Sequence, residues 1–257
     1  MIDALYIGAT GMQAQQQHVD VIANNLANVN TSGFKKNRVL FQDAYYRAQQ
    51  LSASGEANQA ILLGMGTLIA SNNKSFLQGD VKATESPLDL AIRGNGFFEV
   101  LLPDGSSAYT RHGALKVNEN GVLATVSGYE LKQQIEIPVD SVEVVIDASG
   151  KVSSRNSKDN ALAEIGQIEL SSFSNSEGLK PVGDNLFTVT DAAGQVTVNK
   201  PGEDGLGTLA QGYLEGSNVK LSEEMVNLVL AQRAYELSAK VIQASDEMLS
   251  ISNNLRR

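Results

Sequence analysis

Both ends of the chain repeat apolar residues every seven positions, and this spacing restricts what either end can fold into. A seven-residue repeat places apolar side chains on one stripe of an α-helix, and such stripes are buried when helices pack side by side. The N-terminal repeat consists of Leu5, Met12, Val19 and Leu26, with Ile22 in a second row. We therefore predict a helix that ends between Asn28 and Gly33, where the sequence Asn-Thr-Ser-Gly is typical of a turn.

The C-terminal repeat is longer and more regular. Its apolar row consists of Leu221, Leu228, Tyr235, Ile242 and Leu249, with Met225 beside it. Ser217 or Asn218 is placed to cap the first turn of this helix. A helix over residues 219–255 would extend roughly 55 Å at about 1.5 Å per residue, a length typical of a coiled coil or a helical bundle.

Between the two ends the apolar period changes from seven to two. Alternation is clear at Ile135–Ile137, Ser141–Val144 and Phe187–Thr190, and Asn120-Gly121 is a typical hairpin turn. No segment in this region has the pattern of a crossover helix, which disfavours a parallel sheet. We predict a mainly antiparallel β domain.

The sequence therefore predicts an α+β fold with a discontinuous helical domain. Residues 1–34 and 217–257 are expected to pair as a coiled coil or bundle, and residues 85–216 to form the β domain. Residues 35–84 show neither period clearly, and we interpret them as an extended connector with a few local strands.

The N-terminal helix is poorly suited to exist alone in water. From residue 1 to 34 the formally charged residues are Asp3 and Asp20, whereas uncharged amide side chains are frequent. When neighbouring chains exclude water, the free-energy cost of desolvation is lower for an amide side chain than for an ion, provided that the amide finds hydrogen-bond partners. Gly8 and Gly11 each lower helix stability by about 1 kcal/mol. These features favour packing against other copies, although a polar helix face in a monomer stays open. For the C-terminal helix, a single amphipathic helix lying on its own β domain stays open too.

Composition argues against several other classes of function. The formal charge of −9 disfavours nucleic-acid binding, and the absence of cysteine excludes disulfides and thiolate sites. No apolar run reaches the ~20 residues that a membrane-spanning helix needs, and we expect neither direct membrane insertion nor a cleavable secretory signal. Gly94-Asn95-Gly96 lacks the remaining elements of a phosphate-binding loop, and His18 and His112 lie in different predicted domains. We expect no catalytic residue, cofactor or metal.

Several sequence blocks carry a resemblance to a known family. The segment Ala23–Lys35 contains Asn24, Asn25, Leu26, Asn28, Gly33 and Phe34. Further blocks lie at residues 90–98, 109–113, 211–219 and 232–236. Together they resemble, in order, the family of flagellar rod and hook proteins, and the chain is most similar to its distal rod members. A segment at about 43–66 loosely resembles the extra segment of those members but is slightly short, so a proximal rod subunit stays an alternative. A secreted β-rich binding module is another.

The resemblance implies a structural role in the bacterial flagellum. It implies terminal helices that form the inner core of a helical tube, which transmits torque to the hook and serves as an export channel. The implied partners are copies of the chain, proximal rod proteins, the hook protein, and the rings that encircle the rod in the cell wall and outer membrane. The implied location is the basal body, reached through the flagellar type III export apparatus. Phe41 and Tyr45 resemble the pattern by which this family engages the export gate.

Overall fold

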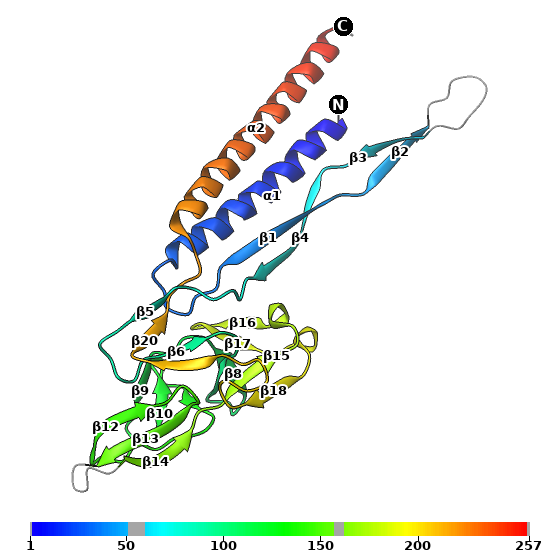
Figure 1. Ribbon diagram of the computed structural model, residues 1–257. Coiled ribbons are helices and arrows are strands. Elements are labelled where there is room, and N and C mark those ends of the chain that lie inside the picture. The colour runs from blue at the N-terminus through cyan, green and yellow to red at the C-terminus, as the bar shows by residue number, and fades with distance from the viewer. Residues whose placement is uncertain (1, 51–59, 157–161, 256–257) are drawn as a thin grey trace. The chain divides into compact units, whose positions relative to one another are not determined.

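The computed structural model of the chain describes residues 2–50, 60–156 and 162–255. The chain divides into two compact units. Unit 1 comprises residues 1–27, 37–74 and 220–257, and unit 2 comprises residues 28–36 and 75–219. Unit 1 contains a helix from each end of the chain, and unit 2 is built mainly from antiparallel strands (Figure 1). The fold is α+β.

The two helices of unit 1 lie side by side and run in opposite directions (Figure 1). α1 spans Ile2–Ala27 and α2 spans Leu221–Asn254. The N-cap of α2 is Lys220, which makes no side-chain cap hydrogen bond. The prediction that Ser217 or Asn218 caps this helix was therefore wrong, because the helix begins after both residues.

Small residues bring α1 and α2 close together. A Cβ atom added at Gly8 would lie 2.9 Å from Ile242 Cγ1, and one at Gly11 would lie 3.4 Å from Ser238 Oγ. Ala231 and Ser245 are buried and lie seven positions to either side of Ser238. The glycines that weaken α1 as an isolated helix thus allow close contact with a row of small residues on α2.

Residues 37–50 and 60–74 form two successive pairs of antiparallel strands. β1 (Asn37–Asp43) pairs with β4 (Thr67–Lys74), with a register shift between Leu40 and Phe41. β2 (Tyr46–Gln50) pairs with β3 (Ala60–Gly64). α1 contacts both β1 and β4. This segment, which shows neither apolar period clearly, is thus a paired hairpin within the same unit as the helices.

The main sheet of unit 2 has seven strands in the order β16-β17-β8-β7-β11-β10-β9. The strands are β7 (Phe98–Leu101), β8 (Ser107–Thr110), β9 (Leu115–Val117), β10 (Leu123–Thr125), β11 (Glu130–Leu131), β16 (Lys180–Gly183) and β17 (Leu186–Thr188). Every pairing between neighbours is antiparallel.

Smaller antiparallel sheets complete unit 2. One has three strands, β12 (Ser141–Ile146), β13 (Lys151–Asn156) and β14 (Leu162–Gln167). The two-stranded sheets are β5 (Val81–Ala83) with β20 (Tyr213–Glu215), β6 (Leu90–Arg93) with β19 (Thr208–Gln211), and β15 (Leu170–Phe173) with β18 (Val196–Asn199). Two 3₁₀ turns, Ser176–Gly178 and Asp191–Ala193, lie among them.

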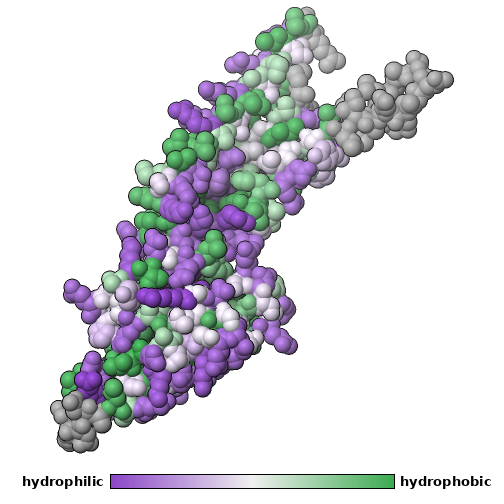
Figure 2. All heavy atoms as spheres, in the orientation of Figure 1, coloured by the Kyte–Doolittle hydropathy of each residue, from purple (hydrophilic) through white to green (hydrophobic). Residues whose placement is uncertain are grey.

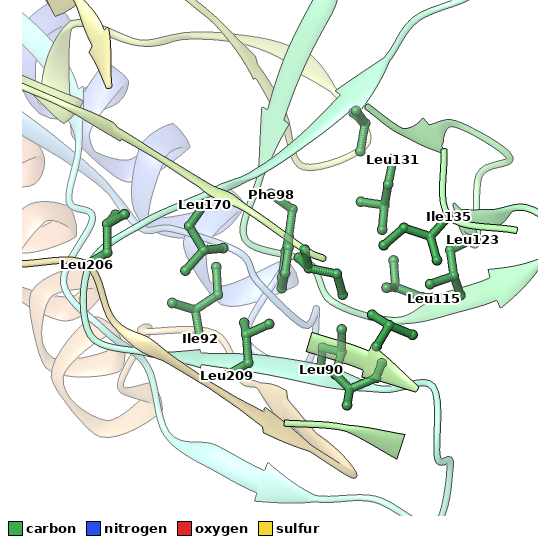
Figure 3. Close-up of a cluster of buried hydrophobic side chains, with 14 of the residues drawn as sticks. Leu90, Ile92, Phe98, Leu115, Leu123, Leu131, Ile135, Leu170, Leu206 and Leu209 are labelled. Carbon is green, nitrogen blue, oxygen red and sulfur yellow. The ribbon is translucent and has the colours of Figure 1, made fainter. Parts of the chain in front are cut away.

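The core of unit 2 is a cluster of aliphatic side chains around Phe98 (Figure 3). Leu90, Leu123, Leu131 and Leu170 belong to it and have no exposed surface. A second, aromatic cluster includes Phe97, Tyr109 and Phe187. The rings of Phe97 and Phe187 meet edge-to-face, as do those of Tyr109 and Phe173. Unit 2 therefore has a hydrophobic core of its own.

We predict that Leu123→Ala destabilises unit 2 by about 2–5 kcal/mol, because the lost methyl groups leave a cavity in a closed core. The matched control is Val126→Ala, since Val126 is 56% exposed. That variant should change the free energy of unfolding by less than about 0.5 kcal/mol. Denaturant unfolding of both variants checks the difference, and equal losses would contradict this core assignment.

Candidate assembly surfaces

Large apolar side chains line the side of α2 that α1 does not cover. Five of them are between 48% and 62% exposed. They are Leu230, Leu237, Val241, Met248 and Ile251. Figure 2 shows hydrophobic residues at the surface along the helices, among hydrophilic ones. We call these five residues the outer stripe of α2. An exposed apolar stripe of this length is typical of a surface that another protein covers.

The predicted assembly residues of α1 are mostly half-buried within the subunit. Ile22 is buried, at 2% exposure, whereas Leu5, Met12, Val19 and Leu26 are intermediate. The corresponding residues of α2 fall into two groups. Leu228, Ile242 and Leu249 are half-buried, and Leu221, Met225 and Tyr235 are exposed. The structure thus gives α2 two apolar faces.

The two helices form an open groove of about 480 Å³. It is lined by Gln16, Val19, Gln232, Tyr235 and Glu236. Val19 and Tyr235 come from the two predicted rows, so the structure brings one member of each row together. The groove has both apolar and amide walls, which suits the side chains of a further helix.

The block from Ala23 to Lys35 crosses from unit 1 to unit 2. Asn24, Asn25 and Leu26 lie in the last turn of α1, and of these Asn25 is buried. Asn28, Gly33 and Phe34 belong to unit 2. The Asn28 side chain accepts a hydrogen bond from Thr31 Oγ1 at 3.2 Å, and Phe34 is 7% exposed.

Glycine is required at position 33. Its φ of +71° lies in the left-handed region, and a Cβ atom there would lie 2.9 Å from the backbone of His112. The Gly33 amide also donates to the Glu215 carbonyl at 2.8 Å. This glycine therefore serves a close backbone approach within unit 2.

A buried ion cluster lies beside this turn. Lys35 Nζ contacts Glu215 Oε1 at 2.6 Å, and both side chains have no exposed surface. Arg111 Nη1 lies 3.5 Å from Glu215 Oε2, and the Arg111 side chain is 2% exposed. Lys35 also donates to the Leu77 carbonyl at 2.7 Å, and Glu215 Oε1 accepts from the Gly79 amide at 2.9 Å. One carboxylate therefore joins chain segments that are far apart in sequence.

The stability of this cluster depends on all three of its charged side chains. Burial lowers the pKa of Lys35, and the Glu215 carboxylate opposes that shift. Burial also lowers the pKa of Arg111, again opposed by Glu215. Removing Glu215 would leave two buried cations together, which is strongly unfavourable. The sequence analysis did not single out these residues as a cluster, although each lies within or beside a block that carries the family resemblance.

The residues of the predicted export motif lie in the hairpin of unit 1. Phe41 is 41% exposed and its ring meets the His18 ring edge-on at a centroid distance of 5.3 Å. Burial lowers the pKa of His18, opposed by Glu224. Tyr45 is 70% exposed, whereas Ala44 between the two aromatic residues is buried. Both aromatic residues of the motif are therefore exposed in the folded subunit.

The part of the chain that the structure describes contains no group of three or more metal-ligating side chains. No helix among the described residues is long and apolar enough to span a membrane. Gly94 and Gly96 have positive φ angles of 116° and 132°, and Leu170 and Leu206 fill the space beside Gly96. This glycine loop is thus a tightly packed turn of unit 2.

Three family models match the chain, and curated relatives cover its full length. The models are "Flagella basal body rod protein" at residues 5–35, "Flagellar hook protein FlgE/F/G D1 domain" at residues 91–154 and "Flagellar basal body rod FlgEFG protein C-terminal" at residues 210–255. The "Flagellar basal-body rod protein FlgG" of Borreliella burgdorferi is 44% identical over 100% of both chains. That of Agrobacterium fabrum is 42% identical over 98% of this chain and 99% of its own. That of Bacillus subtilis is 37% identical over 100% of both.

We predict that Lys35→Met destabilises unit 2 by about 3–5 kcal/mol, since it removes the nearest cation from a buried carboxylate. Lys220→Met is the matched control, because the Lys220–Glu223 pair is exposed on both sides, at 74% and 53%. An exposed pair contributes about 0–1 kcal/mol. Unfolding by denaturant measures both losses, and a Lys35 variant as stable as the control would refute the role of the cluster.

Proposed function

This chain belongs to the family of flagellar basal-body rod proteins and is a structural, non-enzymatic subunit of the distal rod; from that premise we propose that its terminal helices assemble with those of other copies into a helical tube. The outer stripe of α2 is the observation that supports this most directly. Its five large apolar side chains are left uncovered by α1. Burying them against further helices would remove that surface from water.

We propose that the helices meet as a coiled coil or multi-helix bundle formed between subunits. The groove that contains Val19 and Tyr235 would accept a neighbouring helix, and its amides Gln16 and Gln232 would exchange hydrogen bonds with that neighbour. Residues 1–34 and 217–257 would act as the assembly domain. The low charge of the N-terminal segment supports this arrangement.

The partners and the route of export are proposed from the family resemblance. The subunit would contact proximal rod proteins at one end of the tube and the hook protein at the other, with ring proteins around it. The tube would transmit torque and provide the export channel. Export through the flagellar type III apparatus would use Phe41 and Tyr45 before the chain folds.

We predict that Leu237→Asp abolishes rod assembly and motility while leaving the isolated subunit folded. Leu237 is 62% exposed in the subunit, so the change costs little there, but the carboxylate would be buried without a partner in the tube. Gln243→Asp adds the same charge at an exposed polar position of α2 and is the control. The measurements are the melting temperature of each subunit and the yield of basal bodies with complete rods.

A cell that builds normal rods from the Leu237→Asp subunit would contradict the placement of the outer stripe inside the tube. Ile242 is less suited to this test than Leu237. Ile242 packs against Gly8 within the subunit, so Ile242→Asp would disturb the helix pair itself.

A further inference from the structure

The chain passes between its two units at four points, after residues 27, 36, 74 and 219. Any force that the backbone carries from one unit to the other must pass through these four points. At one of them, two consecutive amides are held by asparagine side chains. The Lys36 amide donates to Asn218 Oδ1 at 2.7 Å, and the Asn37 amide donates to Asn25 Oδ1 at 2.9 Å.

Asn218 fastens three chain segments within unit 2. While its oxygen accepts from the Lys36 amide, its nitrogen donates to the Ser75 carbonyl at 2.8 Å and to the Leu77 carbonyl at 3.1 Å. Its own amide lies 3.4 Å from the Phe34 carbonyl. The side chain thus joins the segments next to the crossings after residues 36, 74 and 219.

Asn25 does the same within unit 1. Its nitrogen donates to the Asn37 carbonyl at 2.9 Å and to Glu224 Oε2 at 3.2 Å, while its oxygen accepts from the Asn37 amide. Asn25 and Glu224 are 2% and 3% exposed. The side chain joins the end of α1, the start of β1 and the first turns of α2, which lie next to the crossings after residues 27, 36 and 219.

The chemistry of both positions requires an amide. Asparagine offers one acceptor oxygen and two donor hydrogens, and both side chains use both kinds of group. Aspartate would keep the acceptor but place a negative oxygen against carbonyls, and at position 25 also against Glu224. Alanine would leave the Lys36 or Asn37 amide without its partner, which is unfavourable in a buried site.

We propose that Asn25 and Asn218 are paired positioning residues that hold the four crossings in place while torque passes through the subunit. This inference rests on the proposed role in a torque-transmitting rod. Each side chain forms hydrogen bonds to the chain segments next to the crossings, within its own unit. Together they prevent the backbone from fraying where the chain changes from one unit to the other.

The first test is amide hydrogen exchange in the purified full-length subunit. Asn218→Ala should speed exchange at Lys36 by about tenfold or more and leave Asn37 protected, whereas Asn25→Ala should do the reverse. Asn120→Ala, in an exposed turn of unit 2, is the control and should change neither amide. The proposed role of the two asparagines would be overturned if both amides exchanged at the wild-type rate in both alanine variants. It would also be overturned if exchange at both amides accelerated equally in each variant.

If Asn218→Ala does not fold, Asn218→Asp provides a second test with a side chain of equal size. It keeps the acceptor, so the Lys36 amide should stay protected, but it loses the donors to Ser75 and Leu77. Its melting temperature should fall below that of Asn120→Asp. An Asn218→Asp variant as stable as that control would overturn the proposed role of Asn218.

The second test separates this proposal from the proposed function. In cells whose only copy of the chain carries Asn218→Asp, we expect completed rods but a loss of swimming speed that grows with the viscosity of the medium. Normal speed at every viscosity, with the exchange results as expected, would overturn the mechanical role alone. A wild-type chain that is absent from basal bodies would instead overturn the proposed function.

Discussion

The backbones of α1 and α2 approach closely because glycine occupies positions 8 and 11 of α1, where Ile242 and Ser238 of α2 face it. In this contact Ser238 lies where a larger side chain would hold the helices apart. The position of the large apolar side chains of α2 depends on this close contact between the helices. The inner face of α2 combines the small residues Ala231, Ser238 and Ser245 with Ile242, and five large apolar side chains of that helix lie elsewhere, on its outer stripe. A helix pair built in this way is closed on one side and open to further helices on the other.

Unit 2 is held together by different interactions. It has its own aliphatic core, and its buried Lys35–Glu215 pair fixes the turn that follows α1 in the sequence. Because the core does not depend on other copies, we expect this unit to be ordered in the free subunit, whereas we propose that the outer stripe of unit 1 is covered only on assembly. This difference between the two units agrees with a structural protein that is made as a subunit and functions as a polymer.

The sequence predicted the α+β class and both helices, since long apolar repeats are a strong signal. It did not predict the pairing of β1 with β4, because neither strand contains a buried residue and a register shift at Leu40 breaks their alternation. The row of small residues on α2 was also missed, because a search for large apolar side chains does not select serine and alanine. Asn218 was interpreted as a helix cap, although its partners at Lys36 and Ser75 are distant in sequence and only the fold reveals them. The residues chosen for assembly stay a prediction.

The central claim is that other copies of the chain cover the outer stripe of α2. The chain contains no cysteine, so a single introduced thiol reports its own accessibility. Leu237→Cys should react with a thiol reagent in the free subunit and be protected in isolated basal bodies. Val139→Cys, at a fully exposed position of unit 2, calibrates the reaction of an accessible thiol in the free subunit. Labelling of Leu237→Cys in basal bodies at the rate of the free subunit would contradict the account.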